Sequence, residues 1–453
     1  MNLGDRQIEI ITYVKDYLKK IEKEKIATSL SGLCYFPVWS ETPGHAKLKL
    51  WINGKLYLFK FFYIFLKNIL AIASHSKYSL HNETNSIEKY NKLILSWSSK
   101  ENFKSDGSFQ DKYFCQNSNH LQDSKWILIS TDGYVPSKLN ANIIIIKEEK
   151  TFFKYNFFFL IKNFISLIIE YKFSLRKIVH YFSFHSYFAK EISKIAIKEI
   201  KKNNFKIFLM PYEAQPFHQF TISEVKKINK KIMTIGYIHS MLPAVPCDFV
   251  YRFGSPDLLL VHGESQAEVL QFKLNWPKNK LYLIKSLRFH EDSERELSKK
   301  IYLPYIINNK KFILSNFEKL LKTSPINNFP KFEIQVHSTT INSKKHLILK
   351  NDLKRIMENY SDRFSDNCIN PNISIFFDVT SSIFEALESG TKIIHICSDP
   401  LFQHFNEEIW SNLTNTKIND FVYSYNLVLK GKYINFGQQD NTLSNIIKSI
   451  NLE

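Results

Sequence analysis

Short apolar runs alternate with longer helical patterns from about residue 90 to about residue 420, and this alternation constrains the fold more than any other feature. Strands that alternate with helices indicate βαβ units, and hence parallel sheets covered by helices. The alternation divides near residues 262–290 into two series of strands. The expected strands are Leu93–Trp97, Trp126–Ser130, Asn142–Ile146, Lys206–Met210, Ile232–Ile238, Asp257–Val261, Leu281–Lys285, Phe312–Ser315, Phe332–Val336, Ile373–Val379 and Lys392–Cys397.

One sheet built from all these strands would be large, so two sheets are the simpler solution. We therefore predict an α/β fold in which two Rossmann-like domains face a cleft. Residues 1–88 are expected to form a helical N-terminal extension, 89–275 the first domain, 276–425 the second domain and 426–453 a C-terminal tail.

The 453-residue chain has a formal net charge of +18, which predicts an anionic partner such as nucleic acid, an acidic membrane surface or a phosphorylated substrate. Nucleic acid fits least well, because the lysines are dispersed and the chain lacks zinc-ligand spacings and RNA-binding aromatic signatures. We expect no nucleic-acid partner. A solvated, lysine-rich surface is the alternative explanation for part of the charge.

The five cysteines are far apart and form no CxxC pair, so they predict a reducing cytoplasm rather than a disulfide framework. The N-terminus opens with charged residues and lacks the apolar core of a signal peptide. No window offers about 20 uninterrupted apolar residues, so we expect no membrane span.

Two stretches are nearly apolar throughout. Leu56–Ala73 carries Lys60 and Lys67 on one helical face, and Phe152–Phe173 carries a narrow polar stripe. Such helices can lie in a membrane interface, with aromatic rings inward and lysines towards anionic lipid. They can also be mostly buried helices of a globular domain, and this second interpretation is the one we prefer from the sequence.

Polar residues cluster directly after the predicted strands, where open α/β sheets bind their ligands. A single histidine at a strand end is more often a structural hydrogen-bonding group. Several such ends around one cleft favour a site. These residues are Glu213, Gln215 and His218, then His239 and Ser240, then His262, Gly263 and Glu264, then Ser286 and Arg288, then His337 and Ser338, and finally Thr380, Ser381 and Ser382.

The segment Ile373–Pro400 predicts a buried strand, a Thr-Ser-Ser turn, a short helix, Gly390 and a second strand. A helix that opens after a strand directs free backbone N–H groups and a positive dipole end outward, which suits a phosphate. Ser382 and Glu385 also have the capping-box spacing, so the alternative is a helix that is only well capped.

Several of these motifs together resemble bacterial surface-polysaccharide glycosyltransferases of GT-B fold. They are Glu213 in Tyr-Glu-Ala-Gln-Pro-Phe, His239 in Gly-Tyr-Ile-His-Ser, Gly263-Glu264 and the turn ending at Arg288. Val-Thr-Ser-Ser-Ile-Phe-Glu-Ala-Leu-Glu-Ser-Gly is similar to the donor-nucleotide motif of that fold. In the polysialyltransferase-like and Kdo-transferase-like branches a His-Pro pair accompanies the Ser-Ser pair, whereas this chain has His337-Ser338.

The resemblance implies transfer of a sugar from a nucleotide-sugar donor to a surface glycan. The expected partners are a glycan or lipid-linked glycan acceptor and an anionic membrane surface, at the inner face of the cytoplasmic membrane. The second domain would hold the donor through Thr380, Ser381, Ser382 and Glu385, and the first domain would hold the acceptor. No cofactor is implied, because the nucleotide sugar is a substrate.

The resemblance also implies roles at the reacting centre. Glu213 or His239 would be the general base, and Glu213 is preferred. The alternative for Glu213 is a structural role, as a carboxylate at a helix start that the helix dipole stabilises. Arg288 and His337 would neutralise charge on the leaving phosphate without a metal. The run around Asp362 is expected to be an exposed turn rather than a cation site.

Two other classes stay open. A nucleotide-sugar 2-epimerase of the same fold would share the donor motif, and a non-catalytic polysaccharide-assembly protein would keep the fold without the chemistry.

Overall fold

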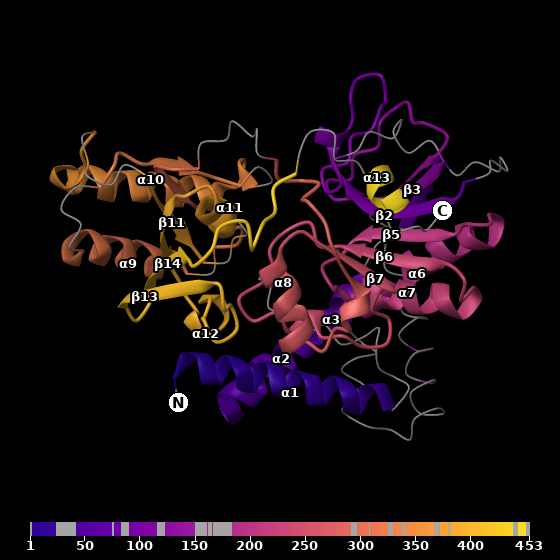
Figure 1. Cartoon of the computed structure of the whole chain (residues 1–453), viewed down its shortest axis with the longest axis horizontal. Coiled ribbons are helices and arrows are strands. Elements are labelled where there is room, and N and C mark those ends of the chain that lie inside the picture. Colours follow the sequence, from indigo (N-terminus) through magenta and orange to yellow (C-terminus); the bar gives the residue numbers. More distant parts are fainter. Residues whose placement is uncertain are drawn as a thin grey trace.

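The structure is a computed structural model, and it has two α/β lobes with three N-terminal helices along one side (Figure 1). It describes residues 2–23, 42–74, 77–82, 90–115, 123–149, 161, 165, 184–290, 297–307, 309–324, 329–337, 340–366, 368, 372–378, 380, 382–437 and 443–449.

The first lobe is built on an eight-stranded sheet in the order β1-β4-β3-β2-β5-β6-β7-β8. Its strands pair in parallel except at one edge, where β1 is antiparallel to β4. The central strand β5 is buried along its whole length, as expected for a parallel sheet covered on both faces. The strands are β1 (Lys77–His81), β2 (Lys92–Ser98), β3 (Ser124–Ser130), β4 (Ile143–Glu149), β5 (Ile207–Pro211), β6 (Met233–Tyr237), β7 (Leu258–Val261) and β8 (Leu281–Leu283).

The second lobe is built on a six-stranded sheet in the order β10-β9-β11-β12-β14-β13. The strands from β10 to β12 pair in parallel, and the hairpin of β13 and β14 adds an antiparallel edge. The strands are β9 (Lys300–Tyr302), β10 (Glu333–Gln335), β11 (Ile373–Phe377), β12 (Lys392–Ile396), β13 (Leu413–Asn419) and β14 (Val422–Leu427).

Helices cover both sheets. Apolar side chains of α6 and α7 pack on one face of the first sheet, and those of α9 and α10 pack on one face of the second. The α-helices of the two lobes are α6 (Phe184–Lys202), α7 (Pro216–Ile228), α8 (Glu264–Glu268), α9 (Lys310–Thr323), α10 (Lys344–Asn359), α11 (Ser382–Glu388), α12 (Pro400–Gln403) and α13 (Leu443–Ser449). Shorter helical turns are η3 (Lys100–Asn102), η5 (Cys247–Phe249), η6 (Val269–Lys273), η7 (Lys278–Lys280) and η9 (Ser361–Arg363).

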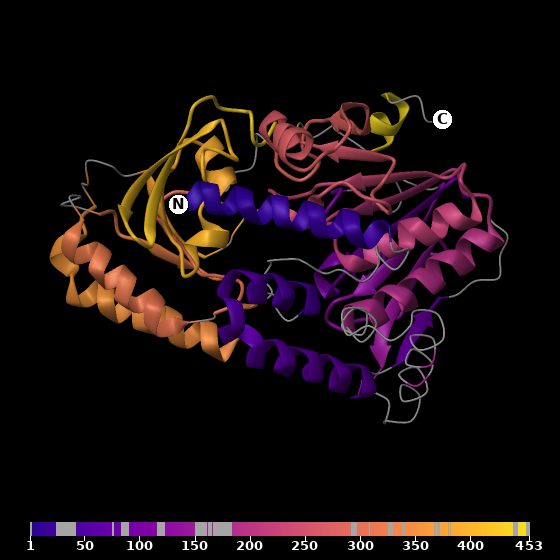
Figure 2. The same ribbon diagram turned by 90° about the horizontal axis from the view of Figure 1, so that it is seen from below.

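The N-terminal helices lie across both lobes (Figures 1 and 2). They are α1 (Leu3–Lys23), α2 (Pro43–Asn53), the turn η2 (Gly54–Tyr57) and α3 (Leu58–Ser74). Gln7 of α1 donates through Nε2 to the carbonyls of Leu401 and His404 at 3.0 and 2.8 Å. Lys49 of α2 forms a 2.7 Å ion pair with Asp399. These contacts hold the helices against the second lobe, while Ile10 and Val14 join the core that runs into the first.

The chain after β14 returns to the first lobe. The backbone N–H of Ser265 donates to the carbonyl of Lys432 at 2.9 Å, and that of Ser286 donates to the carbonyl of Asn435 at 2.7 Å. A Cβ added at Gly263 would lie 1.9 Å from the carbonyl oxygen of Tyr433, so only glycine permits this close crossing. Helix α13 then packs its apolar residues into the core on the other face of the first sheet.

The predicted fold class is confirmed: the chain is α/β, with two mostly parallel sheets and a helical N-terminal extension. Several elements differ from expectation. Leu281–Lys285 was expected to start the second domain, but β8 pairs with β7 in the first sheet. Phe312–Ser315 lies within helix α9 rather than in a strand. The extension contributes strand β1, and the antiparallel β13 and β14 were not predicted.

The preferred interpretation of Leu56–Ala73 as a mostly buried helix is wrong. Only Ile64, Asn68 and Ile72 of helix α3 are buried, and large apolar side chains on its other face are exposed. The second apolar stretch, Phe152–Phe173, lies outside the described residues apart from two isolated positions.

Candidate functional site

The carboxyl ends of β5 and β6 bring Glu213 and His239 together. Oε1 of Glu213 lies 3.3 Å from Nε2 of His239, whose side chain is 4% exposed, while that of Glu213 is 28% exposed. Gln215 donates through its side-chain amide to the other carboxylate oxygen of Glu213. Ala214, beside Glu213, has a φ of +52°, an unfavourable conformation for a residue with a Cβ. The chain is thus bent sharply where it presents the carboxylate.

The protonation states of Glu213 and His239 are complementary. Burial raises the pKa of Glu213, but the hydrogen bonds from His239 and Gln215, together with the charges that His239 and His218 carry when protonated, outweigh burial and hold the pKa below its usual value. Burial lowers the pKa of His239, which Glu213 only partly offsets. At neutral pH we therefore assign an ionised carboxylate that accepts a hydrogen bond from the Nε2–H of a neutral imidazole.

Sequence reasoning missed Tyr113, which packs on this pair. Its ring is edge-on to that of His239 with centroids 4.6 Å apart, and burial, followed by the charge of Glu213, raises its pKa. Asp111 holds the loop in place by accepting from Ser96 Oγ at 2.8 Å and from the backbone N–H of Tyr113 at 2.9 Å. The loop follows β2, the neighbour of β5, but Tyr113 comes well after the strand end, so a rule based on strand ends could not find it.

Two cations approach the same edge of the sheet. Arg288 follows β8, and Ser286 Oγ accepts from its backbone N–H at 3.2 Å. Lys112 precedes Tyr113; its side chain reaches solvent, yet partial desolvation and the charge of Arg288 both lower its pKa. The charge of Arg288 also acts on His239. Within the described residues neither cation forms an ion pair, although the charges of Glu101 and Asp111 act on Lys112.

His337, from the second lobe, is linked to this site through Tyr305. The rings of Tyr305 and His337 are edge-on at 5.2 Å, and Tyr305 is among the groups that act electrostatically on Tyr113. The predicted residues Glu213, His239 and Arg288 are therefore brought together in the first lobe, whereas His337 is connected to them only indirectly, through Tyr305.

The remaining predicted residues lie at the β11–α11 connection of the second lobe. Helix α11 begins at Ser382 itself, whose backbone N–H donates to Thr380 Oγ1 at 3.3 Å. Glu385 is 6% exposed on α11, and Ser381 lies outside the described residues.

Asp378, which the sequence reasoning did not single out, directly follows β11 and has a φ of +53°. Its Oδ1 accepts from the backbone N–H of Ser398 at 2.9 Å, while Oδ2 is buried with no hydrogen-bond partner among the described residues. Burial raises the pKa of this carboxyl. A strained residue with an unpaired buried oxygen beside the predicted donor motif is a further candidate, and its signal was a carboxylate directly after a buried strand.

Two other predicted strand-end histidines, His218 and His262, are buried in the first lobe. His218 caps the start of α7 by accepting from the backbone N–H of Gln215 at 3.3 Å, and burial lowers its pKa to about 3. His262 is fully buried, and burial likewise lowers its pKa to about 3. Asp362 is exposed in the turn η9, as predicted. Within the described residues no group of His, Cys, Asp and Glu could hold a metal ion.

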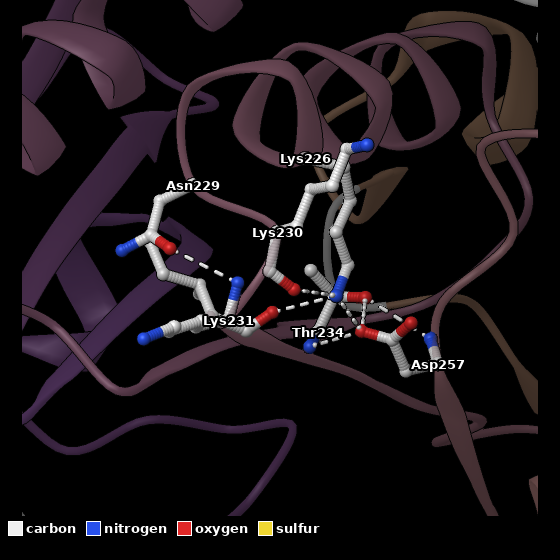
Figure 3. A network of polar contacts seen from close by, with 7 residues as sticks. Lys226, Asn229, Lys230, Lys231, Thr234 and Asp257 are labelled. Atoms are coloured by element: carbon white, nitrogen blue, oxygen red, sulfur yellow. Dashed lines mark hydrogen bonds and ion pairs between the residues drawn. The ribbon is translucent and has the colours of Figure 1, made fainter.

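The opposite edge of the sheet carries a polar network that is structural (Figure 3). Asp257, directly before β7, accepts from the backbone N–H and the hydroxyl of Thr234 at 2.9 and 2.8 Å. Lys226 of α7 pairs with Asp257 and donates to the carbonyl of Ile232 at 2.7 Å. This network joins α7, β6 and β7 at the amino ends of the strands, away from Glu213 and His239.

No protein-family model and no curated protein matches the chain. Among solved structures, α,α-trehalose 6-phosphate synthase from Burkholderia multivorans is similar with 9% identity and a TM-score of 0.34, over 67% of this chain and 85% of that one. A glycosyltransferase from Rickettsia africae is similar with 13% identity and a TM-score of 0.33, over 68% and 79%. The wall teichoic acid polymerase TagF is similar with 11% identity and a TM-score of 0.28, over 74% and 77%.

Proposed function

We propose that the protein is a glycosyltransferase that moves a sugar from a nucleotide-sugar donor to a surface-glycan acceptor. The observation that carries the proposal is the Glu213–His239 pair with two cations, Lys112 and Arg288, close enough to act on each other at the same edge of the sheet. Such a site combines a proton acceptor with positive charge for a phosphate leaving group, and sugar transfer needs both.

In the proposed reaction, the ionised Glu213 accepts the proton of the acceptor hydroxyl while that oxygen bonds to the anomeric carbon of the donor sugar. The bond between this carbon and the donor phosphate breaks, and its electron pair leaves with the nucleotide. His239 donates its Nε2–H to Glu213 and so holds the carboxylate in position. Tyr113 packs on His239 and limits the access of water to the pair.

Arg288 and Lys112 stabilise the negative charge that develops on the leaving phosphate, with His337 approaching from the second lobe. Because fixed cations can perform this task, the proposed reaction is metal-independent. The donor nucleotide is held in the second lobe by Thr380, Ser381 and Ser382 and the N–H groups that open α11. The buried Glu385 of α11 is the fourth residue of this proposed donor site.

The test is incubation of the full-length protein with a panel of nucleotide sugars, with and without a lipid-linked glycan acceptor. A glycosyltransferase consumes donor and releases nucleotide only when acceptor is present. A nucleotide-sugar 2-epimerase converts donor without acceptor, and a non-catalytic assembly protein leaves the panel unchanged. Either of these last two results would refute the proposal.

The nucleotide base is identified by thermal unfolding in the presence of UDP, GDP, CDP or CMP. The cognate nucleotide raises the apparent Tm because it binds the folded state and not the unfolded state. A shift that persists in Glu213→Gln but disappears in Arg288→Ala would assign nucleotide binding to the cations and leave the carboxylate for proton transfer.

A further inference from the structure

Helix α3 and the turn before it carry the densest group of exposed apolar side chains in the described chain. Seven of the twenty large apolar side chains found exposed lie between residues 56 and 70. Six of the seven, all except Leu58, recur at steps of about three or four residues and so lie on one side of the turn and helix. The members of this α3 stripe are Leu56 (93% exposed), Phe59 (90%), Phe62 (53%), Tyr63 (63%), Leu66 (58%) and Leu70 (67%).

The opposite side of α3 fixes the helix on the protein. Ile64, Asn68 and Ile72 are 3%, 5% and 0% exposed. Asn68 Oδ1 accepts from the backbone N–H of Phe184, the first residue of α6, at 3.0 Å. The α3 stripe therefore belongs to a docked helix whose outer face is left to solvent, along an outer edge of the molecule (Figure 2).

The charge around the α3 stripe has one sign. Residues 42–82 contain six lysines and no aspartate or glutamate. Lys55, Lys60 and Lys67 are exposed on η2 and α3, whereas Lys49 of α2 is turned inward and paired with Asp399. Exposed leucine and aromatic side chains beside lysines, without acidic residues, match an anionic lipid surface, where apolar groups enter the acyl boundary and lysines meet headgroups.

A second copy of the chain fits this surface less well. Two α3 stripes packed together would bring their lysines into proximity with no carboxylate from residues 42–82 to compensate them. Clustered exposed apolar side chains mark interaction sites, and the uniform positive charge favours an anionic partner over a like-charged one.

Spanning the bilayer also fits less well. By length and composition alone, the helical segment of residues 44–73 could cross a membrane, and 17% of its most apolar 18-residue window is buried in the protein. However, Ala46 and Leu48 of α2 are buried in the protein, and the chain turns at Gly54 with a φ of +61°. The remaining 17 residues of α3 fall short of the ~20 needed to span.

We propose that the α3 stripe is a membrane-docking surface that lies in the interface of an anionic bilayer, with Lys55, Lys60 and Lys67 against its headgroups. This inference does not depend on the proposed enzymatic activity. It predicts peripheral, reversible attachment, which salt weakens because screening shortens the reach of the lysine charges.

The test is co-sedimentation of the full-length protein with phosphatidylglycerol-containing vesicles and with pure phosphatidylcholine vesicles. We expect binding to the anionic vesicles at about 0.05 M salt and a marked loss at about 0.5 M salt. Phe59→Ser/Leu66→Ser should abolish binding, and Lys60→Glu/Lys67→Glu should weaken it by roughly tenfold or more. Circular dichroism and thermal unfolding verify that each variant is folded.

Matched controls separate the stripe from surface properties in general. Phe272→Ser/Leu429→Ser removes two other exposed apolar side chains, and Lys345→Glu/Lys354→Glu makes the same charge change on α10; both should bind as the wild type does. Failure of the wild type to bind anionic vesicles at low salt overturns the proposal. The proposal is also overturned if analytical ultracentrifugation shows a dimer that Phe59→Ser/Leu66→Ser dissociates while the same variant still binds vesicles. The α3 stripe would then bind a second copy of the chain.

Discussion

Glu213→Gln isolates the proposed general base, because the amide keeps the shape of the carboxylate but does not accept a proton at neutral pH. We expect turnover to fall by about two to four orders of magnitude, the usual contribution of a positioned base, with little change in donor affinity. In free energy this is about 3–5 kcal/mol of transition-state stabilisation.

The structure also limits the effect on stability. The carboxylate of Glu213 accepts from His239 on one oxygen and from Gln215 on the other. The new amide has one oxygen, which can accept from His239, and one NH2 group, which would face the NH2 group of Gln215. These two donors conflict unless the side-chain amide of Gln215 rotates by about 180°. Because the side chain is 28% exposed, water relieves part of this conflict, and the cost should be about 1 kcal/mol.

The assay is initial-rate kinetics with donor and acceptor varied in turn, beside urea unfolding of each variant. The control is Glu224→Gln on α7, whose carboxylate is 30% exposed and ion-paired with Lys227; it should retain normal turnover. Near-normal turnover in folded Glu213→Gln would refute the reasoning and move the role of the base to His239 or elsewhere.

Three further predictions test other parts of the molecule. Ser381→Ala/Ser382→Ala should abolish nucleotide binding, measured by calorimetry, at a stability cost of about 1 kcal/mol; unchanged affinity would remove the donor-site assignment. The pKa of Lys112 is lowered from its ordinary value of 10.5, so its ammonium should lose its proton, and KM for the donor should rise, at a pH below 10.5. Lys112→Arg should move this rise in KM to higher pH, because a guanidinium stays charged; identical pH dependence of KM in the two proteins would exclude this role. Glu388 accepts from three backbone N–H groups of residues 431–434, so Glu388→Ala should lower the free energy of unfolding by about 3 kcal/mol in urea titration; a loss below about 1 kcal/mol would show that the crossing segment does not need this anchor.

The alternation of apolar strands and helical patterns was sufficient to predict the α/β class and most strands of both sheets. Buried parallel strands read as continuous apolar runs, as Trp126–Ser130 and Ile373–Phe377 do, so local composition identifies them. The same signal misled at Phe312–Ser315, because a short apolar run occurs equally on the buried face of a helix such as α9. The polar edge strand β13 carried no such run and was missed.

The sequence also predicted that polar candidate residues follow the ends of several strands, and the structure places three of them there. Glu213, His239 and Arg288 follow β5, β6 and β8, and parallel strands present their carboxyl ends at one edge. It did not distinguish these residues from His218 and His262, because capping a helix and lining a site require similar polar side chains.

Pairing and solvent exposure were decided only by the tertiary structure. Sheet membership of β8 depends on its hydrogen bonds to β7, which the local sequence of β8 does not encode. Tyr113 reaches His239 because β2 and β5 are neighbours although more than a hundred residues separate them. The outer face of α3 is apolar in the sequence whether it meets a core or solvent, and only the packing of the rest of the chain determines which. Local composition thus specifies elements, whereas contacts between distant segments specify the site and the free surface.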